Sequence, residues 1–239
     1  MSRKTQRNLP DPAAEAAVAA RDARAAKRNV IIVGATLLLG LAAVLLWLNM
    51  ERAATRQAAD PQRQAPLASQ HAPLLGEPSA RVHVVEFIDP ACETCAVFYP
   101  IVKVLMDEHP GQIKLSVRHV AFHEGAEAAV RVLEASRNQD RYWQTLEALF
   151  ASQAQWAPHH TVQADLVLQA VAGVGLDMVR LQADMNSPEV SARIERDRAD
   201  AMALQVTKTP TYFVNGRPLP RFGEGPLVEL ITDELARAR

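Results

Sequence analysis

The 239-residue sequence predicts an α/β fold, and three of its features support this class. Apolar, largely β-branched residues alternate with polar ones over residues 81–88 and 113–118, which is typical of strands. Between about residues 124 and 204 the apolar residues recur at helical spacing, and a period of two returns at 211–219. The order is therefore β-α-β, then a block of helices, then β-β-α. It predicts a parallel strand pair that a hairpin extends antiparallel.

A transmembrane helix is predicted for residues 30–48, which contain no charged side chain. At about 1.5 Å per residue this run is roughly 28 Å long, close to the hydrocarbon thickness of a bilayer. Trp47 lies near its outer end, where an amphipathic ring favours the interface. Residues 1–29 contain seven basic and three acidic residues. We therefore expect a mostly disordered cytoplasmic tail, a single pass through the inner membrane, and a C-terminal body on the periplasmic side.

A cleaved signal peptide is the alternative for this apolar run. Signal peptides usually have an apolar region of about 7–15 residues that ends in small residues at a cleavage site. Residues 49–52, Asn-Met-Glu-Arg, offer no such site directly after the run. The sequence therefore favours an uncleaved anchor.

A flexible linker is predicted for residues 49–75, which are rich in Ala, Gln and Arg and are interrupted by prolines. Packing of Leu74 and Leu75 on the edge of the domain is compatible with this linker. The folded domain is predicted to span residues 76–239, with an inserted helical block at about 124–204.

Local signals predict where the elements of this domain begin and end. A strand over residues 81–88 is followed by a helix to about His109, and Pro110-Gly111 forms the break before the next strand. Asn215-Gly216 is typical of a hairpin turn. Further helices are predicted over residues 126–136, 140–151, 161–172, 176–185, from 188 onward with Pro188 first, and 227–238, with Thr161 and Ser187 as N-caps.

Cys92 and Cys95 are the two cysteines of the chain, and they lie two residues apart at a strand-to-helix junction. There the unpaired N–H groups and the positive dipole end of the helix stabilise a thiolate on the first sulfur. The spacing also fits half a zinc site, a copper site or a structural disulfide. A structural zinc site needs four ligands, and the seven His residues are scattered. A disulfide that closes so short a ring restricts the unfolded chain little.

Several separated motifs resemble the DsbA-like branch of the thioredoxin superfamily. They are Gly76-x-Pro78-x-Ala80-x-Val82, Glu86-Phe87-x-Asp89-x-x-Cys92-x-x-Cys95, Pro100 in the following helix, the segment Tyr142-Trp143 to Leu149-Phe150, and Thr209-Pro210-Thr211-Tyr212-Phe213-Val214-Asn215-Gly216. The resemblance covers about residues 76–237. It implies a thioredoxin-like fold with an inserted helical domain, preceded here by the predicted transmembrane helix.

The resemblance also implies roles for individual residues. Cys92 would be the exposed nucleophile and Cys95 the buried resolving thiol. Pro210 would follow a cis peptide bond, bringing the Thr209 backbone against the disulfide to hold an extended substrate chain; an ordinary trans turn is the alternative. Glu86 would relay protons to Cys95, and burial would raise its pKa. A salt-bridged glutamate on an edge strand is the alternative for Glu86.

The dipeptide between the cysteines departs from the best-known form of the family, Pro-His. Here it is Glu93-Thr94. Because Glu93 places a negative charge beside the Cys92 thiolate, we expect a less depressed pKa for Cys92 and a weaker oxidant than a Pro-His enzyme. The same groups serve oxidation, reduction and isomerisation, so the direction of exchange stays open.

The function expected from these features is membrane-anchored disulfide exchange with envelope proteins. No bound cofactor or metal is needed, a membrane redox partner would recycle the cysteines, and a monomer is expected. The alternatives are a copper-binding envelope protein that uses the cysteine pair and a redox-inert interaction domain. The chain after residue 29 carries a formal net charge of about −5, without a basic stripe, which argues against nucleic-acid binding.

Overall fold

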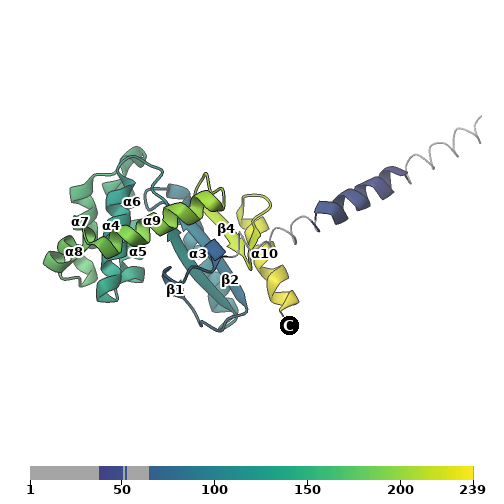
Figure 1. The fold of residues 1–239 in the computed structure, drawn as a ribbon, viewed down its shortest axis with the longest axis horizontal. Helices are drawn as coiled ribbons and strands as arrows, with labels where there is room; N and C mark the ends of the chain where they lie inside the picture. The colour runs from purple at the N-terminus through teal and green to yellow at the C-terminus, as the bar shows by residue number, and fades with distance from the viewer. Residues whose placement is uncertain (1–37, 51, 53–64, 239) are drawn as a thin grey trace, which may run out of the picture. The chain divides into compact units, whose positions relative to one another are not determined.

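The computed structural model describes residues 38–50, 52 and 65–238 (Figure 1). The chain divides into two compact units, Met1–Ala53 and Ala54–Arg239. In the first unit residues 38–50 are helical, and the exposed side chains of this helix include Leu38, Leu39, Leu41, Leu45, Leu46 and Trp47, whereas Leu48 is half-buried. Within the described ranges, no helix is both long enough and apolar enough to cross a membrane. The predicted tail and residues 30–37 of the predicted anchor lie outside those ranges.

The second unit is built on one mixed sheet of five strands in the order β1-β3-β2-β4-β5. Its central pair, β2 and β3, is parallel, whereas β4 runs antiparallel to β2. The hairpin turn at Asn215-Gly216 joins β4 to β5, as its sequence predicts. The strands are β1 (Leu74–Leu75), β2 (Val82–Ile88), β3 (Ile113–His119), β4 (Thr211–Val214) and β5 (Arg217–Pro218).

A block of helices lies between β3 and β4 in the chain and to one side of the sheet in space (Figure 1). This arrangement confirms the predicted helical insertion. Helix α9 runs from the block back to the sheet, so it joins the two parts. The α-helices of the unit are α3 (Glu93–Glu108), α4 (Ala126–Ser136), α5 (Tyr142–Ala151), α6 (Gln153–Trp156), α7 (Ala164–Val171), α8 (Met178–Met185), α9 (Pro188–Ala203) and α10 (Glu224–Arg237).

The two faces of the sheet bury different side chains because successive strand residues point to opposite faces. Val82, Val84 and Ile88 of β2 face the larger core, to which α3, α10 and the helical block contribute. Val85 and Phe87 face a smaller core closed by the end of α9 and by residues before β1. The active-site candidate Glu86 lies on the face of the larger core, beneath α3.

Of the two N-caps predicted from the sequence, the structure confirms one. Ser187 caps α9 through a hydrogen bond from the Val190 N–H at 3.2 Å, as predicted. The predicted cap at Thr161 is wrong, because α7 begins at Ala164 and its N-cap position is Gln163. A short 3₁₀ turn, Pro158–His160, occupies the preceding residues and delays the helix. Asp177, which was not predicted as a cap, accepts hydrogen bonds at the start of α8.

Residues 65–75 pack on the domain, which differs from the predicted flexible linker over residues 49–75. Leu67 is buried in one cluster with Val85 and Phe87. The Pro66 carbonyl oxygen accepts a hydrogen bond from buried Arg118 at 2.8 Å, and β1 pairs antiparallel with β3. The outer face of β2 is apolar and must be covered, a demand that the composition of residues 65–75 does not reveal. Residues 53–64 lie outside the described part of the chain.

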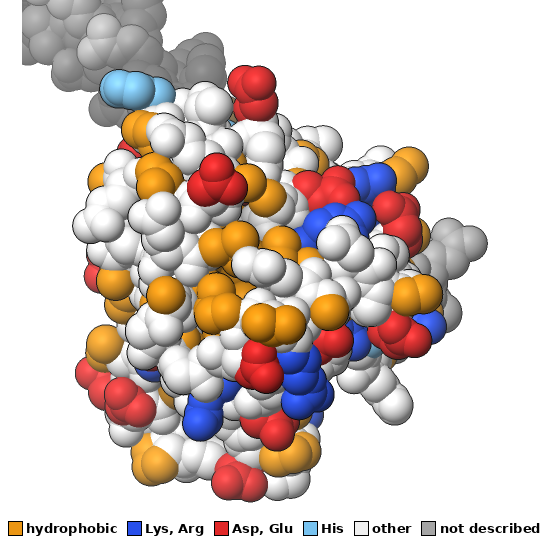
Figure 2. Space-filling model, turned by 90° about the vertical axis from the view of Figure 1, so that its left-hand side faces the viewer, with side chains coloured by type: hydrophobic (Ala, Val, Ile, Leu, Met, Phe, Trp, Pro, Cys, Tyr) orange, Lys and Arg blue, Asp and Glu red, His pale blue; other side chains and the backbone are white. Residues whose placement is uncertain are grey.

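The surface of the helical block carries charges of both signs. Figure 2 shows this face, on which Lys and Arg side chains lie beside Asp and Glu side chains. The ion pairs follow the same pattern: Arg131 lies 2.8 Å from Glu127, and Arg180 lies 3.7 Å from Asp184. A face with such interspersed charges lacks the continuous basic footprint typical of nucleic-acid binding.

Candidate active site

Cys92 occupies the N-cap position of α3, and a turn of three residues separates it from the end of β2 at Ile88. Its carbonyl oxygen accepts a hydrogen bond from the Cys95 N–H at 3.0 Å, so the two cysteines share the first turn of the helix. The first N–H groups of a helix have no partner within the helix and favour negative charge nearby. Both cysteines are free thiols here, and Cys95 is fully buried. The prediction that Cys92 is exposed is wrong, because only 6% of this residue is accessible. Strand β2 and helix α3 thus place one sulfur at the helix end and the other beneath it.

Asp89 holds the turn that leads into the helix. Its carboxylate is buried, and Oδ1 accepts a hydrogen bond from the Ala91 N–H at 2.8 Å. Its other oxygen accepts from the backbone N–H groups of Phe122 and His123 at 2.7 and 2.8 Å. The Cys92 N–H in turn donates to the Asp89 carbonyl oxygen at 3.0 Å. Asp89 therefore fixes the backbone from which Cys92 projects.

Thr209, which precedes Pro210, lies against Cys92, although more than a hundred residues separate them in sequence. The Thr209-Pro210 peptide bond is cis, as the family resemblance implies. The Cys92 sulfur lies 3.5 Å from the Thr209 carbonyl oxygen, to which its thiol form donates a hydrogen bond. Strand β4 begins at Thr211 and pairs antiparallel with β2. This pairing places Thr209 at the end of the sheet near the start of α3.

The two sulfurs have opposite ionisation. Hydrogen bonding to Cys95 is the largest cause that lowers the pKa of Cys92, to about 5, with further contributions from the backbone at Cys95 and Thr94. Burial raises the pKa of Cys95 far above its usual range, and the neighbouring Cys92 and Glu86 charges add to this. At neutral pH, Cys92 is thus the thiolate and Cys95 the thiol, which are the states of a nucleophile and a resolving group.

Glu86 lies in the middle of β2 and is fully buried. Burial raises its pKa to about 8, opposed by a hydrogen bond from Tyr212 and reinforced by the Cys92 charge. The Tyr212 hydroxyl donates to Glu86 Oε1 at 2.7 Å. This position excludes the alternative of a salt-bridged glutamate on an edge strand, because β2 is paired on both sides.

Glu93 and Thr94 form the exposed start of α3. Of these two, the Thr94 backbone is among the main causes of the lowered pKa of Cys92, whereas Glu93 is not. The expectation that Glu93 weakens the oxidant concerns a comparison with a Pro-His dipeptide, and it stays a prediction.

Two residues of the site were not assigned roles from the sequence, Asp89 and Tyr212. Both occur in the motifs that resemble the family, but their partners are remote. Tyr212 lies directly opposite Glu86 in the β2–β4 register. Only the strand pairing reveals this contact, so local sequence carries no signal for it. For Asp89, the signal was an acidic side chain at the end of a buried strand.

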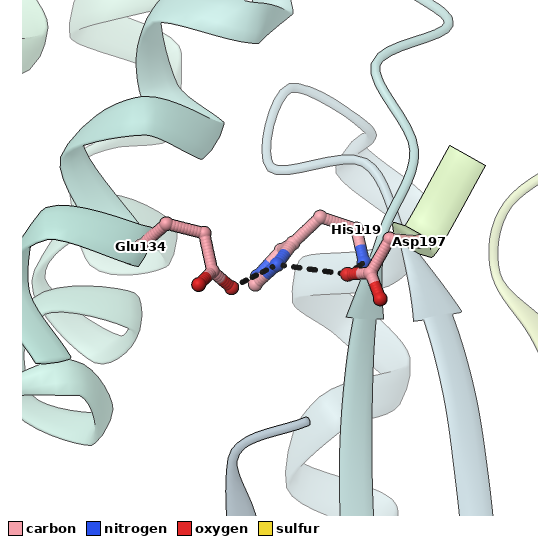
Figure 3. Close-up of side chains that lie close together, drawn as sticks. All are labelled: His119, Glu134 and Asp197. Carbon is pink, nitrogen blue, oxygen red and sulfur yellow. Dashed lines mark hydrogen bonds and ion pairs between the residues drawn. The ribbon is translucent and has the colours of Figure 1, made fainter. Parts of the chain in front are cut away.

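A second cluster of titratable groups lies away from the cysteines. Within the described part of the chain, only His119, Glu134 and Asp197 form a group of three possible metal ligands within 4.8 Å (Figure 3). The imidazole of His119 lies between the two carboxylates, with its Nδ1 at 3.0 Å from Glu134 and 3.6 Å from Asp197. Neither cysteine belongs to this group.

Arginines already neutralise these carboxylates. Glu134 Oε2 lies 2.6 Å from Arg193 and 2.7 Å from Arg137, and Asp197 is paired with Arg118. A metal ion would have to displace these cations inside the fold, which is costly. The cluster is therefore a buried ion network that joins β3, α4 and α9. Among the described residues, no His, Asp or Glu forms a group of three possible metal ligands with Cys92 and Cys95, as the copper alternative would favour.

Comparisons with known proteins agree with this site. A family model described as Thioredoxin matches residues 68–223. Disulfide bond formation protein D of Bacillus subtilis is 28% identical over 172 residues, which cover 68% of this chain and 77% of that protein. The structure of a thioredoxin-like oxidoreductase from Silicibacter pomeroyi DSS-3 superposes with a TM-score of 0.63 at 32% identity, covering 74% of this chain and 99% of that one.

A further relative is much longer than this chain. The Na(+)/H(+) antiporter NhaA of Herminiimonas arsenicoxydans is 34% identical over 144 residues, which cover 60% of this chain. These residues correspond to 22% of the antiporter, so the match spans about a fifth of that relative's length.

The fold, the cysteine pair and the cis-proline together define a thioredoxin-like protein with a redox-type site. The family model matches well over half of the chain. With its helical block between β3 and β4, the chain belongs to the DsbA-like branch of the thioredoxin superfamily.

Proposed function

We propose that this chain is a membrane-anchored thiol:disulfide oxidoreductase that exchanges disulfides with envelope proteins. The observation that carries the proposal is the position of the Cys92 sulfur. It lies at the N-terminus of α3, 3.5 Å from the Thr209 carbonyl oxygen, and the buried Cys95 thiol is on the same helical turn. Family membership supports the same chemistry.

The chemistry is a pair of sulfur exchanges. The Cys92 thiolate attacks a substrate disulfide, forms a mixed disulfide and releases one substrate thiolate. Cys95 loses its proton and attacks the Cys92 sulfur, which forms the Cys92–Cys95 disulfide and releases the second substrate thiolate. In reverse, the same steps oxidise a substrate dithiol. Glu86 is the buried group that takes or returns the Cys95 proton. The backbone beside Thr209 and Pro210 binds the substrate chain.

We place the domain on the periplasmic side of the inner membrane, with the N-terminus in the cytoplasm. The uncharged residues 30–48 and the basic residues before them support this orientation. The exposed apolar side chains of residues 38–50 are compatible with lipid contact. The protein acts as a monomer without a bound cofactor, and a membrane redox protein recycles its cysteines.

A transfer experiment with the purified full chain tests the activity. The oxidised protein is mixed with a reduced, unfolded substrate that contains two cysteines, and substrate thiols are counted over time. We expect the wild type to transfer its disulfide and Cys92→Ser to transfer none. Equal behaviour of the two proteins would instead support a redox-inert domain, and stoichiometric binding of Cu(I) without thiol transfer would support the copper alternative.

A further inference from the structure

Tyr212 and Glu86 form a buried pair beneath the cysteines. They lie directly opposite each other in the β2–β4 register, and both side chains are almost completely buried. The Tyr212 hydroxyl donates to Glu86 Oε1 at 2.7 Å. Glu86 Oε2 is buried without a hydrogen-bond partner in the described part of the chain. Glu86 Oε1 therefore accepts the hydrogen bond from Tyr212, and Oε2 is available to accept a proton.

The ring of Tyr212 packs against α3, the helix that carries the cysteines. Phe98, one turn after Cys95 on α3, lies 6.4 Å from it between ring centroids. The hydroxyl is thus fixed by strand pairing on one side and by α3 on the other. A phenol held in this way cannot follow Glu86 into a second orientation.

We propose that Tyr212 is a positioning residue that holds Glu86 by Oε1 and leaves Oε2 to exchange a proton with the Cys95 thiol. This inference rests on the proposed function, because it concerns the step in which Cys95 attacks the mixed disulfide. Tyr212 itself gains and loses no proton in this step.

The step balances as a proton transfer coupled to sulfur exchange. The Cys95 thiol gives its proton to Glu86 Oε2, and the Cys95 sulfur attacks the Cys92 sulfur. The bond from Cys92 to the substrate sulfur breaks, and the substrate leaves as a thiolate. Because the hydrogen bond from Tyr212 lowers the pKa of Glu86, its loss makes the carboxylate harder to keep ionised.

The test uses Tyr212→Phe in the full chain, with oxidised glutathione as the probe. Reduced protein attacks the probe through Cys92 and releases one glutathione, and Cys95 then releases the second. The rate of the second release is measured against pH. We expect Tyr212→Phe to move the midpoint of this profile upward by about 1 pH unit, the scale of a hydrogen bond to a charged group. Glu86→Gln should remove the inflection.

Tyr142→Phe is the matched control. Its hydroxyl is also buried and hydrogen-bonded, to His119 at 2.9 Å, but it lies in the helical block. Tyr142→Phe should lower the free energy of unfolding by about as much as Tyr212→Phe does. Its rate of second glutathione release should follow the same pH profile as that of the wild type. In the Glu86→Gln background, Tyr212→Phe should leave the rate of the second release unchanged at each pH, because the tyrosine acts only through Glu86.

The outcomes separate this inference from the proposed function. Two outcomes would overturn the positioning role while leaving exchange intact. One is an unshifted profile for Tyr212→Phe, and the other is an equal effect of Tyr212→Phe on the rate of the second release with Gln at position 86. Failure of the wild type to release the second glutathione would refute the exchange function and the inference that rests on it.

Discussion

Cys92 and Cys95 are neighbours on one helical turn, yet their surroundings give them opposite chemistry. Cys92 lies at the helix N-terminus and accepts hydrogen bonds, whereas Cys95 is buried in the first turn of α3 near Glu86. A stabilised thiolate favours the reduced form of the pair, which makes the disulfide form an oxidant. Burial and hydrogen bonding at two residues therefore set the redox behaviour of the whole site.

The first prediction concerns the ionisation of Cys92. The rate of its alkylation by iodoacetamide follows the thiolate, so it should rise with pH around the pKa of about 5 and stay level above pH 7. Hydrogen bonding to Cys95 is the main cause, so Cys95→Ala should move the midpoint upward. Cys95→Ser, which keeps a donor, should move it less. A wild-type midpoint near the ordinary cysteine value, about 8.5, would refute this assignment.

The second prediction concerns the dipeptide between the cysteines. Replacing Glu93 and Thr94 together by Pro and His should raise the reduction potential by at least about 30 mV, which corresponds to a tenfold change in the exchange equilibrium. The added imidazole stabilises the Cys92 thiolate, and the negative charge is removed. Equilibration with glutathione buffers measures the potential. Glu93→Gln alone isolates the charge and should give a smaller rise. An unchanged or lower potential in the double variant would count against the argument.

At the scale of elements, the buried ion network ties distant segments together. Arg118 of β3 is paired with Asp197 of α9, and His71, before β1, lies 2.7 Å from the same carboxylate. Burial alone would raise the pKa of Asp197, but hydrogen bonds with His119 and His71 and the Arg118 charge hold it well below its usual range. The network thus attaches residues 65–73 and the helical block to the sheet.

The third prediction follows from this network. Asp197→Asn removes one of the two carboxylates that pair with buried Arg118 and leaves Asp200 as the other. It should lower the free energy of unfolding by about 3 kcal/mol, the low end of the cost of breaking a buried ion pair. Because the folded pKa of Asp197 is depressed, its contribution is present above the unfolded value near pH 4 and is lost as the pH falls. The variant should therefore show a weaker loss of stability in acid.

Urea unfolding at pH 7 and in acid measures both effects. Glu195→Gln on the same helix is the control, because its partner Arg198 is exposed and such pairs contribute about 0–1 kcal/mol. Equal unfolding free energies for Asp197→Asn and the wild type would show that the network does not hold the segments together.

At the scale of the whole molecule, the element order was accessible from sequence because strand and helix periods differ. Val82–Ile88 and Thr211–Val214 show a period of two, and Ser187-Pro188 marks the start of α9. The family motifs located Cys92, Cys95 and the cis peptide bond before Pro210. These signals are local, so a sequence displays them directly.

Contacts between remote segments were not accessible in the same way. The pairing of Tyr212 with Glu86 depends on strand register, and the burial of Leu67 depends on an apolar sheet face that another segment must cover. The charges of Arg118 and Asp197 are indistinguishable in sequence from solvated ones. Only the fold brings them together, which is why the sequence did not predict the ion network or the packing of residues 65–73.

The most direct test of disulfide exchange by Cys92 is to trap its partners. Cys95→Ala, expressed in its own host, cannot resolve the mixed disulfide, so envelope proteins should accumulate on Cys92 and be released by reductant. The Cys92→Ala/Cys95→Ala double variant should capture none. Adducts that contain cysteine-bearing envelope proteins are the predicted result. Equal capture by the two variants, or no adducts despite normal expression, would contradict the account.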